Sequence, residues 1–159
     1  MMLIGLKGIT EDIIIGHHDG NKMKYIIGID TSSRQIDFVV LSSTKEWIAF
    51  WSSKVSDDIK DMDQKLINLY QNFKRDISLL WEGGLYLKDL VAYVESPIYV
   101  QNIKTTVSLS QTVGMVKLVL FDYKIPCFTV DNRSWKKDIL GDGKADKTKA
   151  FEFAKAIFG

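Results

Sequence analysis

Two carboxylates in this sequence stand where an active site could be built. Asp30 ends the apolar stretch YIIGID (25–30), and Glu95 ends a second one, LVAYVE (90–95). In α/β sheets, functional side chains gather where strands end and loops leave the core. If these two strands are neighbours, both acids lie at one edge, where they repel each other unless a cation sits between them. The pair therefore predicts a site for Mg²⁺, which prefers oxygen ligands.

The chemistry that such a site supports is phosphodiester hydrolysis. A bound divalent ion activates a water and stabilises the leaving oxygen, and two ions about 4 Å apart can do both. For each acid taken alone, a structural role is the alternative, because an acid after a strand is also a common turn residue or helix cap. The residues DTSS (30–33) would make a good turn by themselves.

Basic residues gather in the last third of the chain, although the whole protein is nearly neutral. The formal net charge is +1, so the composition gives no general sign of a nucleic-acid partner. A local cluster of cations can nevertheless neutralise phosphates and make binding fall steeply with salt. Its interspersed acids, Asp138, Asp142 and Asp146, leave open a solvated surface of mixed charge. The cluster comprises Arg133, Lys136, Lys137, Lys144, Lys147 and Lys149.

The elements that must position these residues form an α/β layer fold. Short polar turns separate the first three strands and indicate an antiparallel meander. Helices then alternate with strands, which favours parallel pairing. The predicted order is strands 24–30, 35–42 and 46–53, helix 57–82, strand 90–96, helix 104–123, strand 125–131, helix 132–140, and a glycine-flanked loop and last helix within 141–159.

Three details of the predicted helices can be checked directly. Asp57 and Asp58 are expected at the N-terminus of helix 57–82, where acids are favourable. Asn132 is expected to cap the helix that begins there. Gly114 interrupts an otherwise apolar helix, which predicts tight packing against a neighbour.

Length and composition limit the class of protein. A chain of 159 residues with 46% apolar and 26% charged residues suits one soluble domain. The single cysteine, Cys127, excludes an internal disulfide, and no apolar run is long enough to span a membrane. Residues 1–22 are predicted to be an appendage, with a hairpin as one form, because Met23 would make a natural chain start. His17 and His18 point to different sides of a strand, which favours a solvated turn over a metal site.

Four stretches together resemble the RuvC family of Holliday junction resolvases, particularly its phage-encoded members. They are IIGIDTSSRQIDFVVL, VAYVESPIYVQN, LSQTVGMV and LGDGKADKTKAFEFAK, and the similarity spans roughly residues 24–158. The first is similar to the family's Gly-Ile-Asp opening strand, the second to its strand ending in a catalytic Glu, and the third to its helix with an embedded Gly. The fourth is the most specific, because Gly141, Gly143, Ala145 and Lys147 have the family's spacing.

The resemblance implies a ribonuclease H-like fold with a mixed sheet flanked by helices, a homodimer, and symmetrical nicking of four-way (Holliday) DNA junctions. Asp30 and Glu95 would be catalytic residues and the ligands of Mg²⁺, with Mn²⁺ as its substitute. Lys147 would be the catalytic basic residue that contacts phosphate near the cut. No membrane partner is implied, and the location would be cytoplasmic, in a bacterial host cell if the protein is phage-encoded.

The resemblance also implies a set of DNA-binding residues. The loop SPIYVQN (96–102) would enter the junction, with Tyr99 or Ile98 at the position of the family's base-wedging aromatic. Tyr99 is favoured because its ring can stack on a base. The implied DNA-binding residues are Tyr99, Asn102, Lys104, Arg133, Lys136, Lys137, Lys144 and Lys147.

One element of the family pattern is not found. RuvC-like enzymes carry one or two further acids on a C-terminal helix, which is expected to follow Gly159; residues 23–159 would then be a nuclease domain without that helix. The alternative is a catalytically impaired RuvC-like module that binds DNA or a partner. A third class, the actin and sugar-kinase superfamily, has an opening similar to GIDTSS, but its second glycine loop is missing here.

Overall fold

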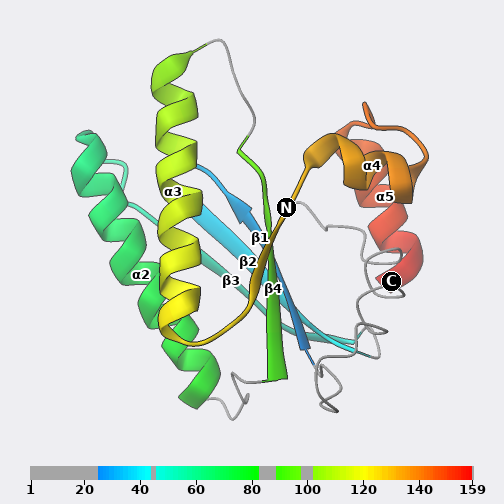
Figure 1. The fold of residues 1–159 in the computed structure, drawn as a ribbon, viewed down its shortest axis with the longest axis horizontal. Helices are drawn as coiled ribbons and strands as arrows, with labels where there is room; N and C mark the ends of the chain where they lie inside the picture. Colours follow the sequence, from blue (N-terminus) through cyan, green and yellow to red (C-terminus); the bar gives the residue numbers. More distant parts are fainter. Residues whose placement is uncertain (1–24, 44–45, 83–88, 98–101, 159) are drawn as a thin grey trace.

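The central sheet has five strands. Residues 25–43, 46–82, 89–97 and 102–158 are described in the computed structural model of the chain. The sheet has the order β3-β2-β1-β4-β5 (Figure 1), and its strands are β1 (Tyr25–Thr31), β2 (Gln35–Ser42), β3 (Trp47–Lys54), β4 (Leu90–Glu95) and β5 (Cys127–Val130). The first three pair antiparallel, whereas β4 is parallel to β1 and β5 is parallel to β4. The predicted meander and the parallel pairs are confirmed.

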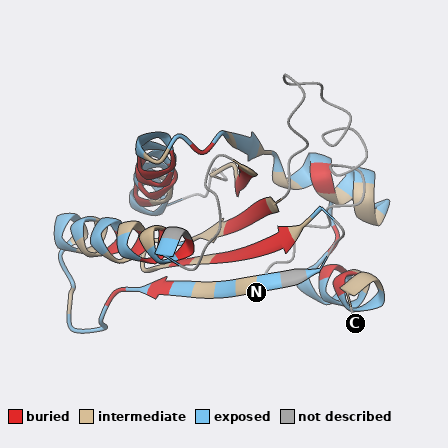
Figure 2. Cartoon of the chain, turned by 90° about the horizontal axis from the view of Figure 1, so that it is seen from below, coloured by how far each residue is buried: buried red, intermediate tan, exposed pale blue. Residues whose placement is uncertain are grey.

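Helices flank the sheet on both faces (Figures 1 and 2). They are α2 (Met62–Glu82), α3 (Ile103–Asp122), α4 (Asn132–Leu140) and α5 (Lys147–Phe158). Helices α2 and α3 pack beside each other against one face, and α5 contributes Phe158 to the packing on the other. Within the described residues, no helix is both long and apolar enough to cross a membrane.

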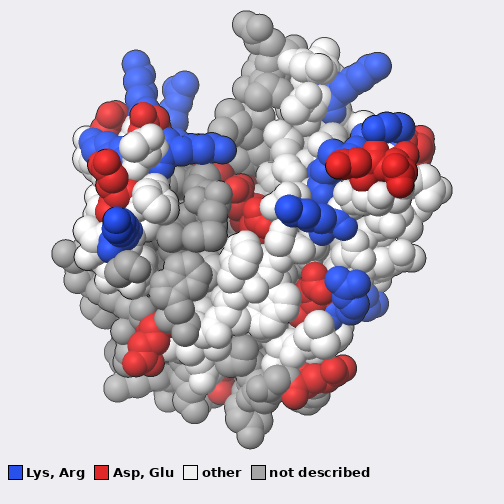
Figure 3. Space-filling view, turned by 180° about the vertical axis from the view of Figure 1, so that it is seen from behind, with Lys and Arg blue, Asp and Glu red and all other residues white. Residues whose placement is uncertain are grey.

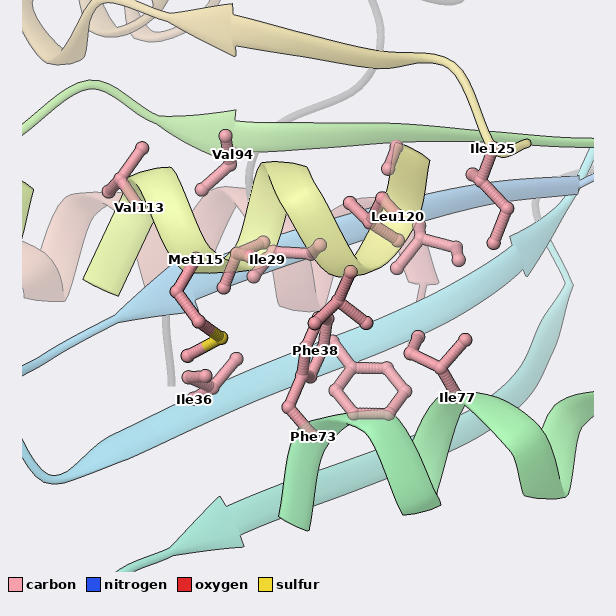
Figure 4. Close-up of a cluster of buried hydrophobic side chains, with 14 of the residues drawn as sticks. Ile29, Ile36, Phe38, Phe73, Ile77, Val94, Val113, Met115, Leu120 and Ile125 are labelled. Carbon is pink, nitrogen blue, oxygen red and sulfur yellow. The ribbon is translucent and has the colours of Figure 1, made fainter. Parts of the chain in front are cut away.

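The larger core lies between the sheet and the pair α2–α3 (Figure 4). Side chains alternate between the two faces of a strand, so Ile29 of β1, Phe38 of β2 and Val94 of β4 all face this core. Phe73 of α2 meets the Phe38 ring edge-on, with 5.5 Å between ring centroids. This packing fixes the backbone of the central strands.

A smaller apolar cluster occupies the opposite face. It contains Ile26, Val39, Leu41, Val91 and Tyr93, with Val130 and Phe158 packed against it. The residues that follow on this face, at the ends of β1 and β4, are Asp30 and Glu95. The strand alternation therefore carries the polar ends of β1 and β4 to the side of α4 and α5.

The start of α2 differs from the sequence expectation. The helix begins at Met62, and Asp57 and Asp58 precede it. The Asp61 carboxylate accepts a hydrogen bond from the Gln64 backbone N–H at 2.9 Å. Asp61 therefore satisfies one of the unpaired N–H groups in the first turn of the helix, and the expectation that α2 starts at 57 is wrong.

Two further expectations are corrected. Asp131, not Asn132, is the N-cap of α4, because its side chain accepts from the Ser134 backbone N–H at 2.9 Å. Asn132 is the first helical residue, and its side chain is free to contact another element. At Gly114, nothing lies within 4 Å of the position a Cβ would take. The expected tight packing at Gly114 is therefore absent among the described residues of this chain.

Candidate active site

Asp30 and Glu95 lie next to each other at the ends of neighbouring parallel strands. The β1–β4 ladder ends with the pair Ile29 and Val94, and the two acids are the next residue on each strand. Since Ile29 and Val94 face the α2–α3 core, the acids face the opposite side. Both are partly buried. The structure thus brings together the two side chains that the sequence singled out.

Burial and mutual repulsion disfavour negative charge at this position. Burial, followed by the charge of Asp30, raises the pKa of Glu95 to about 7. Burial, followed by the charge of Asp37, raises the pKa of Asp30. A cation between the carboxylates would reverse both effects by stabilising the ionised forms.

Asp37 is a neighbour of the pair that sequence reasoning missed. In the antiparallel β1–β2 ladder it lies directly opposite Asp30. The Gln35 side-chain amide donates to both Asp37 oxygens, each at 2.7 Å. The described residues contain no group of three or more His, Cys, Asp or Glu side chains that could hold a metal, so Asp37 acts on Asp30 through its charge. The alternation of side chains in QIDFVVLS indicates which face of the strand carries Asp37. That Asp37 lies opposite Asp30 depends on the strand register, which the sequence does not give.

Helix α4, which follows β5, contacts Glu95. The Asn132 side-chain amide donates a hydrogen bond to Glu95 Oε1. One turn later, the indole N–H of Trp135 is buried and has no hydrogen-bond partner of normal geometry among the described residues, yet it lies close enough to Glu95 to lower the pKa of that carboxyl. Sequence reasoning treated Asn132 as a cap and gave Trp135 no role, because nothing local indicates which strand α4 meets.

Two of the predicted basic residues reach the acids electrostatically. Lys147, the first residue of α5, lowers the pKa of Asp30. Lys136 of α4 lowers the pKa of Glu95, and its ammonium lies 5.8 Å from the centroid of the Trp135 ring. These two lysines therefore lie close enough to the acid pair to influence its charge, and their predicted DNA-binding roles stay predictions.

The remaining basic residues lie around the glycine loop between α4 and α5. Gly141 ends α4 with φ of 71°, a left-handed conformation that favours glycine. A Cβ at Gly143 would lie 3.0 Å from the Arg133 carbonyl oxygen, so the loop approaches α4 too closely for a side chain there. An open depression of about 400 Å³ beside the loop is lined by Arg133, Ser134, Lys137, Asp142, Gly143 and Lys144.

The predicted junction-binding loop is only partly described. Tyr99 and Ile98 lie outside the described residues, as does the predicted appendage 1–22. Asn102 is the N-cap of α3, accepting from the Lys104 backbone N–H at 3.0 Å. Both Asn102 and Lys104 are exposed, and their DNA-binding role stays a prediction.

The face that carries the site has a mixed surface. Figure 3 shows acidic side chains in a hollow, with Lys and Arg side chains on both sides of it. Flanking cations of this kind attract a polyanion. The arrangement suits a phosphodiester backbone lying across the ends of β1 and β4.

Most of the chain matches one known protein family. The profile described as "Crossover junction endodeoxyribonuclease RuvC" matches residues 26–158. The chain belongs to the RuvC family. The RuvC of Baumannia cicadellinicola is 24% identical over 136 residues, covering 85% of this chain and 75% of the relative. The RuvC of Haemophilus influenzae is also 24% identical, over 85% of this chain and 68% of the relative.

Solved RuvC structures share the fold. Thermus thermophilus RuvC in complex with a Holliday junction substrate superposes with a TM-score of 0.66 at 16% identity, covering 86% of this chain and 80% of that one. A second T. thermophilus RuvC structure gives 0.63 at 14% identity. The predicted ribonuclease H-like fold and the RuvC relationship are confirmed, while membership of the phage-encoded branch stays a prediction.

Proposed function

We propose that this RuvC family member is an endonuclease that nicks four-way DNA junctions with a divalent cation, Mg²⁺ or, as its substitute, Mn²⁺. The observation that carries the proposal is the meeting of Asp30 and Glu95 at adjacent ends of β1 and β4, on the face away from the main core. A pair of carboxylates with raised pKa values on a rigid sheet is a suitable mount for one hard cation.

The residues fit the metal that the family implies. Asp30 and Glu95 would hold it, since carboxylate oxygens are the ligands that Mg²⁺ prefers. When bound, the cation supplies activation of a water and stabilisation of the leaving oxygen. Asp37 increases the negative potential at Asp30 and so favours cation entry. Lys147 and Lys136 would pair with phosphates on either side of the acids, which orients the strand to be cut.

Branched DNA is the substrate that the basic surface and the family relationship support. Arg133, Lys137 and Lys144 line one depression, and Lys144 and Lys149 line a second one of about 550 Å³. Together with Lys136 and Lys147 they would follow the phosphate backbone away from the acids. The T. thermophilus RuvC structure of similar fold is a complex with a Holliday junction substrate.

A homodimer is supported by the outer surface of α3. Ile103, Val107, Leu118 and Phe121 are large apolar residues with 69%, 44%, 68% and 77% of their surface exposed. They lie at helical spacing on the surface that also carries the open Gly114. An apolar helix face of this kind usually meets another protein. A second copy, related by a two-fold axis, would supply the second site for symmetrical cuts.

The proposal is tested with a labelled four-way junction. The wild-type chain is incubated with the junction and Mg²⁺ beside Asp30→Asn, and nicks that depend on Asp30 and on Mg²⁺ are expected. Junction binding without Asp30-dependent nicks would support a binding module instead. Size measurement of wild-type and Phe121→Glu protein tests the dimer, because a charge placed within an apolar interface dissociates it.

A further inference from the structure

We propose that Asn132 is a positioning residue that holds the Glu95 carboxylate in one orientation, so that Oε1 is engaged by α4 and Oε2 is left for the metal. The inference rests on the proposed function and deepens it by assigning to α4 a role in building the metal site. Its basis is the hydrogen bond from the Asn132 amide to Glu95 Oε1. The indole N–H of Trp135 also lies near this carboxylate.

The backbone on both sides of this contact is fixed. Glu95 is paired with Val130 in the β4–β5 ladder, and the Ser96 N–H donates to the Val130 carbonyl at 2.8 Å. Only Asp131 separates Val130 from Asn132. The connection between the two interacting side chains therefore runs through a hydrogen-bonded strand pair and a single residue.

The first turn of α4 is equally constrained. The Asp131 carboxylate accepts from both the backbone N–H and the hydroxyl of Ser134, each at 2.9 Å. Trp135 is 2% exposed and anchors the same helix against the body of the protein. Residues three apart share one face of a helix, so Asn132 and Trp135 approach Glu95 together. A helix fixed at its cap and by a buried indole can hold a side chain with little freedom.

The physical effect follows from the freedom of a glutamate. A free Glu side chain has several rotamers, and ordering it on metal binding costs entropy. A hydrogen bond to one carboxylate oxygen before the metal arrives removes part of that cost. Outer partners of metal-bound carboxylates typically change metal affinity or activity by about 10–100-fold when removed. We expect a loss of that size when the Asn132 amide is replaced.

Two substitutions separate positioning from stability. Asn132→Ala removes the donor, and Asn132→Leu removes it while keeping a side chain of similar size and adding no charge. Leu is a good helix former, so Asn132→Leu should leave the melting temperature close to that of the wild type. Asp138→Asn, an exposed change on the same helix, is the matched control. Asn132→Gln retains an amide and should recover part of the lost function.

The main measurement is the affinity of the DNA-free protein for Mn²⁺, determined by electron paramagnetic resonance. Both Asn132→Ala and Asn132→Leu should weaken binding about 10–100-fold, whereas Asp138→Asn should not change it. The Mg²⁺ concentration that gives half-maximal junction cutting should rise in parallel, with junction affinity in the absence of metal unchanged for Asn132→Ala. In ¹⁵N spectra, the Asn132 side-chain amide should shift on Glu95→Gln substitution.

The outcomes distinguish this inference from the proposed function. Wild-type Mn²⁺ affinity in folded Asn132→Leu protein would overturn the positioning role even if the wild type cuts junctions. A loss of junction affinity in Asn132→Ala without metal would also overturn it, by making Asn132 a DNA contact. Weakened Mn²⁺ binding in a chain whose wild type never cuts would support positioning and refute the nuclease.

Discussion

The two faces of the sheet are built for different purposes from the same strands. On the α2–α3 face, Ile29, Phe38 and Val94 are buried in a continuous apolar core. On the other face, the same strands end in half-buried acids with raised pKa values, near the buried indole N–H of Trp135. The well-packed face therefore provides the rigidity that holds the carboxylates of the opposite face close together despite their repulsion.

The largest effect should come from substituting the two acids on the polar face of the sheet, which is the face that carries Asp30 and Glu95. Asp30→Asn and Glu95→Gln each remove a metal-binding charge and should lower junction cutting by about 10³-fold or more. Both changes also relieve repulsion of the DNA backbone, so junction binding should stay equal or improve. Cutting and gel-shift assays on the same junction measure the two effects. Full cutting activity in either variant would remove that residue from the site.

Truncating a side chain on the apolar face of the sheet, which packs against α2 and α3, should instead reduce stability. Phe73 is fully buried, so Phe73→Ala should lower the free energy of unfolding by about 3–5 kcal/mol. Phe128, on the edge strand of the polar face, is 52% exposed and stacks on Tyr93 with 5.7 Å between ring centroids. Phe128→Ala should cost only about 1 kcal/mol. Urea unfolding compares the pair, and equal losses would contradict the proposed division between the faces.

The pH dependence of stability sharpens the contrast further. The pKa of Glu95 is about 7 in the folded chain against an ordinary value of 4.5, so between these values the folded state holds a proton that the unfolded state has lost. The free energy of unfolding should therefore fall as the pH rises through this range in metal-free buffer.

Glu95→Gln should flatten that decline, and Mg²⁺ should offset it by stabilising the ionised carboxylate. Melting temperatures at pH 5 and pH 8, with EDTA and with Mg²⁺, provide the measurement. An identical decline in wild-type and Glu95→Gln protein would show that another group is responsible.

The smallest effect concerns a single cation at the edge of the polar face. Lys147→Ala should weaken junction binding by one phosphate contact, which reduces the slope of log K against log salt by about one. Lys155, near the other end of α5, is exposed and serves as the matched control. Binding isotherms at several salt concentrations test this, and a slope unchanged by Lys147→Ala would exclude the contact.

Much of this architecture follows from local patterns. The period-2 and period-3.6 arrangements of apolar residues predicted the strands and most helices, because each depends on the direction of side chains along one element. Expectations failed where a neighbour decides the outcome. The polar residues before α2 included three acids that could begin a helix, and Asp61 rather than Asp57 or Asp58 is the one that caps it. At Gly114 nothing among the described residues lies within 4 Å of a Cβ position, so the packing expected from its small size is not made there.

The sequence by itself determined that Asp30 and Glu95 end apolar strands and that glycines allow a tight turn before Lys147, since these are properties of neighbours along the chain. Only the tertiary structure decided that Asp37 lies opposite Asp30 and that Asn132 holds Glu95. Strand register and helix docking are set by long-range packing, and a register shift of one residue in β2 would turn Asp37 to the other face of the sheet.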